Sequence, residues 1–362
     1  MSNDKSQLDL HVLIQQVLEA QTDNLDQLAA IVGLNLAEDF AESDLSHTIL
    51  IGADLIEADL RGADLRSANL SNATLRGADL RGADLRSANL SSADLRSANL
   101  RGADLREADI KSTRLDSANL SDANLGCADL DNANLSRADL RGIDLRDSKL
   151  CGAILTDAKL RAANLGRADL RVANLRGAQL IRAYLGGADM RGADLDGADL
   201  SEADLSDAKL SSAKLRGTNL KGANLSIADL AGVTLIRANL SGVNLIRANL
   251  SGADLIRTNL SGADLSGADL SLADLSLANL YLANLCSANL IRANLSIAEL
   301  GGANLIAANL SDADLRGANV ENAQFARNQG IAEETKLVLL RRGAIFEDTT
   351  SDSDRTEVLT PH

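Results

Sequence analysis

A five-residue repeat dominates this chain. From Phe40 to Phe325 every fifth residue is large and apolar, and nearly all of these residues are leucine. Two places before each leucine stands a small residue, usually alanine, and an aspartate or asparagine lies between the two, as in Ala63-Asp64-Leu65. The two residues that follow the leucine are polar or small. A repeat that covers most of a chain decides its fold, so its period must be explained first.

A period of five matches neither a single helix nor a single strand. Each residue of an α-helix turns about 100°, so these leucines would be spread around the whole helix surface. In one long strand they would alternate between the two faces. A solenoid buries all of them if each pentapeptide forms one short side of a coil, with the leucine and the small residue pointing inward. The sequence therefore predicts an all-β solenoid in which the other three residues of each pentapeptide face water.

Some corners carry a larger residue than alanine, including Thr113, Ile143 and Thr258. We expect a slight widening of the coil at these corners, and the largest effect at Ile143.

The repeat resembles a known family. Units such as Ala63-Asp64-Leu65-Arg66-Ser67 are similar to the A(D/N)LXX repeat of pentapeptide repeat proteins, and the resemblance covers residues 40–325. It implies a right-handed quadrilateral β-helix with four pentapeptides in each coil. Residues 20 apart would then stack on one another, and the repeat would make about 14 coils.

The segments outside the repeat are predicted to be helical or disordered. Residues 1–39 form an N-terminal helical cap, because Leu10, Ile14 and Val17 recur at helical spacing. This cap either shields the first coil or also recruits a partner. Residues 326–346 form a C-terminal helical cap with a helix from about Ala332 to Arg342, in which Leu337, Leu339 and Leu340 face the last coil. Residues 347–362 are a disordered acidic tail.

The charge of the chain is acidic but mixed in sign over the repeat. The net charge is −15, yet residues 40–325 hold 37 acidic and 30 basic side chains. Two rows of arginines 20 residues apart, each with acidic or amide residues two places earlier, predict a neutralised surface or a face that docks an acidic partner. The rows are Arg61, Arg81 and Arg101, and Arg66, Arg86 and Arg106. Direct binding of nucleic acid is not expected, since phosphate contacts need a net basic surface.

The second half of the repeat offers the candidate protein-binding residues. Ile236, Ile256, Leu277 and Ile297 occupy outward positions on one side of four successive coils. Nearby sides add Leu272, Tyr281, Leu282, Ile291 and Ile306. Apolar residues on adjacent coils predict an interface, with a second copy or with another protein. Cover by the C-terminal segment, or drift on a tolerant repeat, would also explain the row.

No catalytic, metal-binding or cofactor-binding residues are predicted. The aspartates recur by repeat position rather than as a distinct group, and the histidines His11, His47 and His362 are dispersed. Cys127, Cys151 and Cys286 fall too far apart in a quadrilateral coil to form a disulfide. No apolar run approaches the length of a membrane span. We expect a cytoplasmic protein that does not bind membranes.

Two functions follow from this pattern. The first is a non-enzymatic protein–protein interaction scaffold, a rigid rod that presents charged and apolar ladders to protein partners, with a homodimer as one form of the contact. The alternative is a DNA-mimicking modulator of a type II topoisomerase, as the resemblance to the family implies for some members. That mimicry needs an acidic surface, which the mixed charges of residues 40–325 do not favour.

Overall fold

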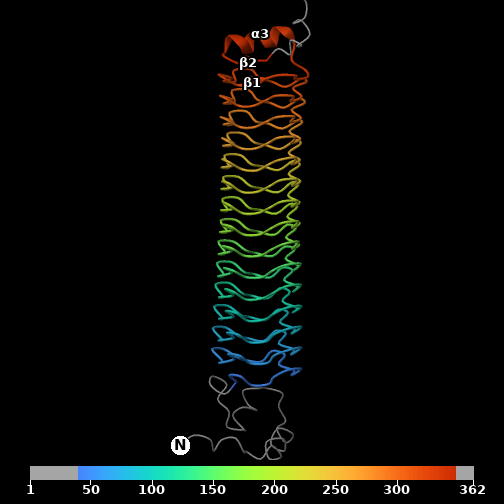
Figure 1. Ribbon diagram of the computed structural model, residues 1–362. Helices are drawn as coiled ribbons and strands as arrows, with labels where there is room; N and C mark the ends of the chain where they lie inside the picture. Colours follow the sequence, from blue (N-terminus) through green and yellow to red (C-terminus); the bar gives the residue numbers. More distant parts are fainter. Residues whose placement is uncertain (1–39, 348–362) are drawn as a thin grey trace, which may run out of the picture. The chain divides into compact units, whose positions relative to one another are not determined.

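The computed structural model describes residues 40–347, which fall into two compact units. Unit 1 ends at Lys214 and unit 2 begins at Leu215. The helical segments predicted within residues 1–39, and the predicted tail after Glu347, lie outside the described residues. In each unit the chain winds into a stack of similar coils (Figure 1).

One coil takes four pentapeptides in both units. Asp64 forms a parallel bridge with Asp84 in unit 1, and Asn259 does so with Asn279 in unit 2. Backbone hydrogen bonds join the same coils: the Leu245 N–H donates to the Asp264 carbonyl at 2.7 Å, and the Asp264 N–H donates to the Val243 carbonyl at 2.9 Å. The prediction that residues 20 apart stack is therefore confirmed within each unit.

A tight turn follows each leucine and begins the next side. The Ala63 N–H donates to the Leu60 carbonyl at 3.1 Å, and Gly62 inside this turn has a φ of 65°. A positive φ at the second central residue is typical of a type II turn, and glycine adopts it without strain. Ile297 takes the same conformation at a φ of 57° although it is β-branched. Such residues persist where the surroundings fix the backbone, here through the stacked coils.

The aspartate or asparagine before each leucine also shapes the turn. Its Oδ1 accepts the backbone N–H two residues later, as Asp84 does from Arg86 at 3.2 Å. In unit 2 asparagines are bonded from coil to coil as well: Asn279 Nδ2 donates to Asn259 Oδ1 at 3.3 Å, and Asn259 Nδ2 donates to Asn239 Oδ1 at 3.2 Å. These side chains are half-buried, so the prediction that they simply face water was wrong.

The leucines and alanines form the core that the repeat predicts. Leu245 and Ala248, for example, are buried. The larger corner residues are also buried, and the turn opens slightly to accept them. The Ile143 N–H lies 3.3 Å from the Leu140 carbonyl, compared with 3.0 Å between Ala163 and Leu160. The turn at Thr113 opens to the same 3.3 Å, so the expectation of the largest effect at Ile143 was wrong. The backbone bond from the Asn164 N–H to the Ile143 carbonyl keeps an ordinary 2.9 Å, so the corner widens without breaking the stack.

Unit 2 ends in two short strands and a helix. Strand β1, Gln324–Phe325, pairs in parallel with β2, Ile345–Phe346, and helix α3, Glu333–Arg341, lies between them in the sequence (Figure 1). The rings of Phe325 and Phe346 stack with centroids 4.9 Å apart. In α3 only Leu339 is buried, whereas Leu337 and Leu340 are exposed. The prediction that all three pack was wrong for these two, because a single helix turns only one narrow face inward.

The chain approaches itself closely between β1 and α3. Gly330 has a φ of 78°, and a Cβ atom at this position would lie 2.2 Å from the Cα atom of Ser311. Asn328 lies just before it, and its Nδ2 donates to the Leu305 carbonyl at 2.5 Å and to the Ala308 carbonyl at 3.2 Å. Glycine is therefore required here for the close approach, and Asn328 adds side-chain hydrogen bonds to carbonyl groups that also accept backbone N–H groups.

Candidate functional site

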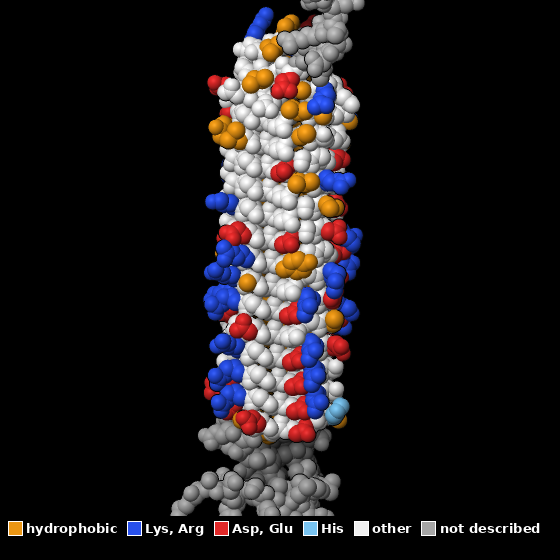
Figure 2. Space-filling view, viewed as in Figure 1, with side chains coloured by type: hydrophobic (Ala, Val, Ile, Leu, Met, Phe, Trp, Pro, Cys, Tyr) orange, Lys and Arg blue, Asp and Glu red, His pale blue; other side chains and the backbone are white. Residues whose placement is uncertain are grey.

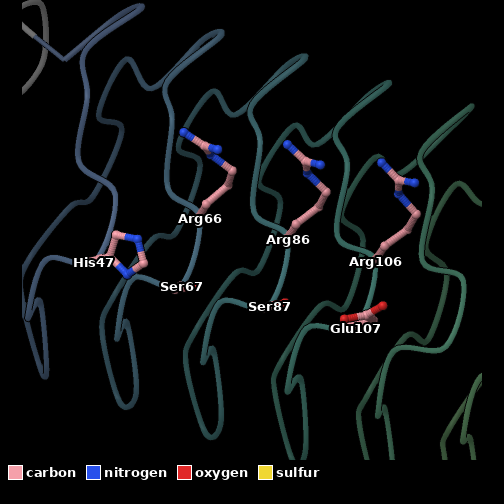
Figure 3. Close-up of a pocket in the computed structure, with 7 residues that line it drawn as sticks. All are labelled: His47, Arg66, Ser67, Arg86, Ser87, Arg106 and Glu107. Carbon is pink, nitrogen blue, oxygen red and sulfur yellow. The ribbon is translucent and has the colours of Figure 1, made fainter.

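The arginine row at Arg66, Arg86 and Arg106 borders a shallow hollow in unit 1. Figure 3 shows the three guanidinium groups on successive coils, with His47 and Glu107 at the two ends. The hollow has a volume of about 340 Å³ and is also lined by Ser67 and Ser87. All seven lining residues belong to turns, so the hollow is a groove between neighbouring turns rather than a deep pocket.

Each arginine of this row is already bound to an aspartate. Arg86 donates from Nε to Asp84 Oδ1 at 2.8 Å and from Nη2 to Asp84 Oδ2 at 2.6 Å, and its Nε lies 3.8 Å from Asp104 Oδ2 on the next coil. Arg66 and Asp64 form the same fork. Bidentate pairing of this kind fixes the guanidinium and offsets its charge. The predicted neutralised surface is thus present, and Figure 2 shows it as a column of paired acidic and basic side chains.

The second row, Arg61, Arg81 and Arg101, follows the same rule with one exception. Arg81 is bound to Asp79 at 2.6 Å. Arg101 follows Asn99, which has no carboxylate, and its Nε instead lies 3.6 Å from Asp122 Oδ2. The residue two places before an arginine therefore decides whether the guanidinium is held in a fork.

These forks lower the pKa of the aspartates. Hydrogen bonds from the Arg66 side chain hold the pKa of Asp64 at about 2, and those from Arg61 do the same for Asp59. The pKa of Asp84 is lowered for the same reason, by the Arg86 side chain. Low values keep these carboxylates ionised, so they are unsuited to act as general acids or bases near neutral pH.

The lowered pKa values predict acid sensitivity of unit 1. An aspartate with a folded-state pKa near 2, against about 3.9 in an unfolded chain, stabilises the fold above pH 4. That contribution is lost as the pH falls from about 4 to about 2. NMR titration of carboxyl groups should show Asp64 protonating near pH 2, and closer to pH 4 in the variant Arg66→Gln. Equal midpoints in both proteins would show that the fork does not set the pKa of Asp64.

In unit 2 the four predicted binding residues lie on one corner of consecutive coils. Backbone bonds join the turns that carry them: the Arg237 N–H donates to the Ile256 carbonyl at 3.1 Å, and the Leu277 N–H donates to the Ser296 carbonyl at the same distance. Ile236 and Ile256 take the first turn position and are half-buried. Leu277 and Ile297 take the second position, with 42% and 62% of their surface exposed. We call Ile236, Ile256, Leu277 and Ile297 the apolar row.

A groove follows the N-terminal part of this row. It has a volume of about 380 Å³, and Ile236 and Ile256 form its apolar floor. Arg216, Arg237 and Arg257 lie around them. The sequence interpretation missed these arginines, although the signal was present: the dipeptide Ile-Arg recurs 20 residues apart at Ile236-Arg237 and Ile256-Arg257.

Other apolar side chains of unit 2 lie on neighbouring corners. Leu272, Tyr281 and Leu282 are more than half exposed, whereas Ile291 and Ile306 are half-buried. Tyr281 and Leu282 extend over Gly301 and Gly302 of the next coil, where an added Cβ would lie 3.2 Å from the tyrosine ring and 2.7 Å from the leucine Cδ2. Contact with these glycines partly covers Tyr281 and Leu282. Both residues lie on a different corner from the apolar row.

Side chains that commonly bind metal ions are dispersed among the described residues. Among residues 40–347 no three His, Cys, Asp or Glu side chains are grouped so that they could hold a metal ion. Cys127, Cys151 and Cys286 are free, as expected. In the same part of the chain, no helix has both the length and the apolar character needed to cross a membrane.

Comparison with known proteins identifies the family. The family model for pentapeptide repeats matches eight times, at residues 39–77, 73–111, 113–152, 153–192, 188–226, 223–262, 253–296 and 293–327. The chain belongs to the pentapeptide repeat family. The predicted family is thus confirmed, and with it the right-handed β-helix. No curated protein matches the chain in a sequence search.

Several solved structures of pentapeptide repeat proteins are similar to this chain. HetL from the cyanobacterium Nostoc sp. strain PCC 7120, a protein involved in heterocyst differentiation regulation, is 37% identical, with 65% of this chain and 88% of HetL covered and a TM-score of 0.27. A thylakoid lumen protein of Arabidopsis thaliana is 28% identical, with 44% and 83% covered and a TM-score of 0.22. QnrB1, a plasmid-mediated fluoroquinolone resistance protein, is 18% identical, with 51% and 94% covered and a TM-score of 0.29.

Proposed function

We propose that this protein is a non-enzymatic scaffold for protein–protein interaction, and that the apolar row of unit 2 is a contact surface for a protein partner. The observation that carries the proposal is the alignment of four large apolar side chains on one corner of consecutive coils. Single exposed apolar residues are common on any protein surface, but a contiguous set is typical of an interaction site. The proposal includes a cytoplasmic location, about 14 coils, and helical caps at both ends of the repeat.

The chemistry of the repeat supports a binding role over a catalytic one. Several aspartates of unit 1 are held by arginines two residues later, as Asp84 is by Arg86. Their carboxylates also accept backbone N–H groups of the turns, so they shape the coil. The same pairing gives unit 1 a surface of both signs, whereas imitation of a DNA duplex requires a continuous acidic face. We therefore favour the scaffold over the modulator of a type II topoisomerase.

Paired variants test the proposal. The double variant Ile256→Asp with Leu277→Asp places charges in the middle of the apolar row. The amount of each partner protein that it captures from a cell extract should be at least about tenfold lower than with the wild-type chain. The position of Leu277 tolerates aspartate, because Asp122 and Asp312 adopt the same positive φ at equivalent positions. Quantitative mass spectrometry of the captured proteins gives the readout.

The matched control is Ile246→Asp. Ile246 and Ile236 stand in the same sequence, Leu-Ile-Arg-Ala-Asn. Ile246 lies two pentapeptides after Ile236, on the opposite side of the coil. The control should capture the same proteins as the wild type. If the double variant also retains all of them, the apolar row is not the contact surface.

Light scattering coupled to size exclusion shows whether the partner is a second copy. A wild-type mass of two chains that falls to one chain in the double variant, with an unchanged circular dichroism spectrum, would place a homodimer contact on the row. A mass of one chain in both proteins would assign the row to a different protein.

A further inference from the structure

The strongest unassigned feature is the pair of arginines beside the apolar row. This inference rests on the proposed function, and it concerns the chemical class of the partner. Arg237 and Arg257 lie on adjacent coils, immediately after Ile236 and Ile256, and these four residues line the groove of unit 2 together with Arg216 and Gly217. Both arginines are exposed.

These two guanidinium groups differ from those of unit 1 in their pairing. Across residues 40–347, no carboxylate forms an ion pair with Arg237 or Arg257. The reason is that no acidic residue takes the equivalent turn position on the neighbouring coils, where Gly217 and Leu277 stand. Arg167 and Arg182 of unit 1 take the same second turn position and do pair, with Asp147 and Glu202 one coil away. In the rows of unit 1 described above, the arginine directly follows the leucine and reaches the aspartate two residues earlier, as Arg86 reaches Asp84. At Arg237 and Arg257 isoleucine takes that place and the arginine comes one residue later, at the second turn position.

The groove therefore combines an apolar floor with two uncompensated positive charges. Such a surface complements a partner that carries apolar and acidic side chains side by side. A buried arginine–carboxylate pair at an interface is also strongly directional, because the planar guanidinium binds a carboxylate with two hydrogen bonds. A basic partner would be disfavoured, because its positive charges would repel the two arginines.

The spacing of the apolar row indicates the shape of that partner. Stacked coils lie about 4.8 Å apart, so the row presents one apolar side chain at each such step. An α-helix rises about 5.4 Å in each turn and presents one side chain on a given face at each turn. A helix that lies along this corner would thus place roughly one residue against each of the four coils. It would cross from Ile236 and Ile256 at the first turn position to Leu277 and Ile297 at the second. The mismatch is about 0.6 Å for each coil, which side chains can absorb.

We infer that the apolar row and its arginines bind an acidic amphipathic α-helix of a partner protein. Its apolar residues, three or four positions apart, contact the row, and its glutamates or aspartates pair with Arg237 and Arg257. Recognition of an amphipathic helix along an apolar groove is a recurrent mode of protein interaction. Three coil steps, or about 14 Å, separate Ile236 from Ile297, so the helix needs about three turns, or roughly 10 residues.

Two synthetic helical peptides of about 18 residues test this assignment on the full chain. Both carry leucines one helical turn apart. One has glutamates beside the first two leucines, and the other has lysines there. Fluorescence anisotropy should show the glutamate peptide binding at least about tenfold more tightly than the lysine peptide, with an affinity that falls as salt rises.

Charge reversal on the protein provides the decisive comparison. The double variant Arg237→Glu with Arg257→Glu should reverse the preference toward the lysine peptide. The variant Arg247→Glu is the control, because Arg247 follows Ile246 in the same sequence context on the opposite side of the coil. It should leave the preference for the glutamate peptide unchanged.

The outcomes separate this inference from the proposed function. If neither peptide binds, or if the two bind equally, the row does not recognise an acidic helix, while capture that depends on Ile256 and Leu277 would still support the scaffold. If the glutamate peptide binds and the preference reverses as described, the assignment holds. Binding that survives Ile256→Asp with Leu277→Asp would place the peptide elsewhere and overturn the inference.

Discussion

Replacing Leu245 with alanine should lower the free energy of unfolding of unit 2 by about 2–5 kcal/mol. Leu245 is fully buried, and it belongs to the column of inward leucines with Leu225 and Leu265 on the adjacent coils. The coils cannot close over the lost side chain, because the Leu245 N–H is bonded to the Asp264 carbonyl at 2.7 Å and the backbone spacing is fixed by the ladder. A cavity that cannot collapse gives the upper part of this range.

Hydrogen exchange and chemical denaturation together measure this effect. In a solenoid each coil contacts only its neighbours, so faster exchange should be concentrated in the coils next to Leu245. Ile227→Ala is the control: Ile227 is 61% exposed, and its loss should change the free energy of unfolding by less than about 0.5 kcal/mol. A cost of Leu245→Ala as small as that of the control would show that the inward leucines do not stabilise the coils.

Replacing Phe325 with alanine should destabilise the end of unit 2 by about 3–5 kcal/mol. The Phe325 side chain is completely buried, and its ring stacks on that of Phe346. The same contact holds β2 to β1, and the Glu347 N–H donates to the Phe325 carbonyl at 3.0 Å. Lys336 of α3 lies over the Phe346 ring, with its Nζ 5.4 Å from the ring centroid. Loss of the Phe325 ring therefore removes contacts of β2 directly and of α3 through Phe346.

Limited proteolysis is the measurement for this prediction. Cleavage within α3 should become much faster in Phe325→Ala and in Phe346→Ala, because both variants remove the stacked pair. Ile345→Ala, which changes the exposed residue of the same strand, should be cut at nearly the wild-type rate. If α3 resists the protease equally in all four proteins, the aromatic pair does not hold the end of unit 2 together.

The sequence was sufficient to predict the solenoid and its core. The leucine period, with alanine two places earlier, leaves no other way to bury these side chains, and the twenty-residue coil follows from the resemblance to the family. The ends were predicted less well. A short helix such as α3 shows several apolar residues in sequence, and only the packing against the coil determines that Leu339 is buried while Leu337 and Leu340 are not.

The candidate site was predicted in part for a related reason. The 20-residue spacing places Ile236, Ile256, Leu277 and Ile297 on one corner, and the structure has them there. Spacing alone does not show that the first two are half-buried and the last two exposed, since this depends on their position within the turn. Nor does it show that Arg237 and Arg257 lack the aspartate fork of the unit 1 arginines. An arginine at the second turn position is neutralised only where an adjacent coil places a carboxylate beside it, as Asp147 does for Arg167.

Side-chain footprinting is the most direct test of the central claim that the apolar row contacts a protein partner. Hydroxyl radicals oxidise exposed leucine and isoleucine side chains, so the free chain should react at Leu277, Ile297 and Ile227, which are 42%, 62% and 61% exposed. In the complex with a captured partner, we predict protection of Leu277 and Ile297, with Ile227 oxidised as in the free chain. Unchanged oxidation of Leu277 and Ile297 in that complex would contradict the account.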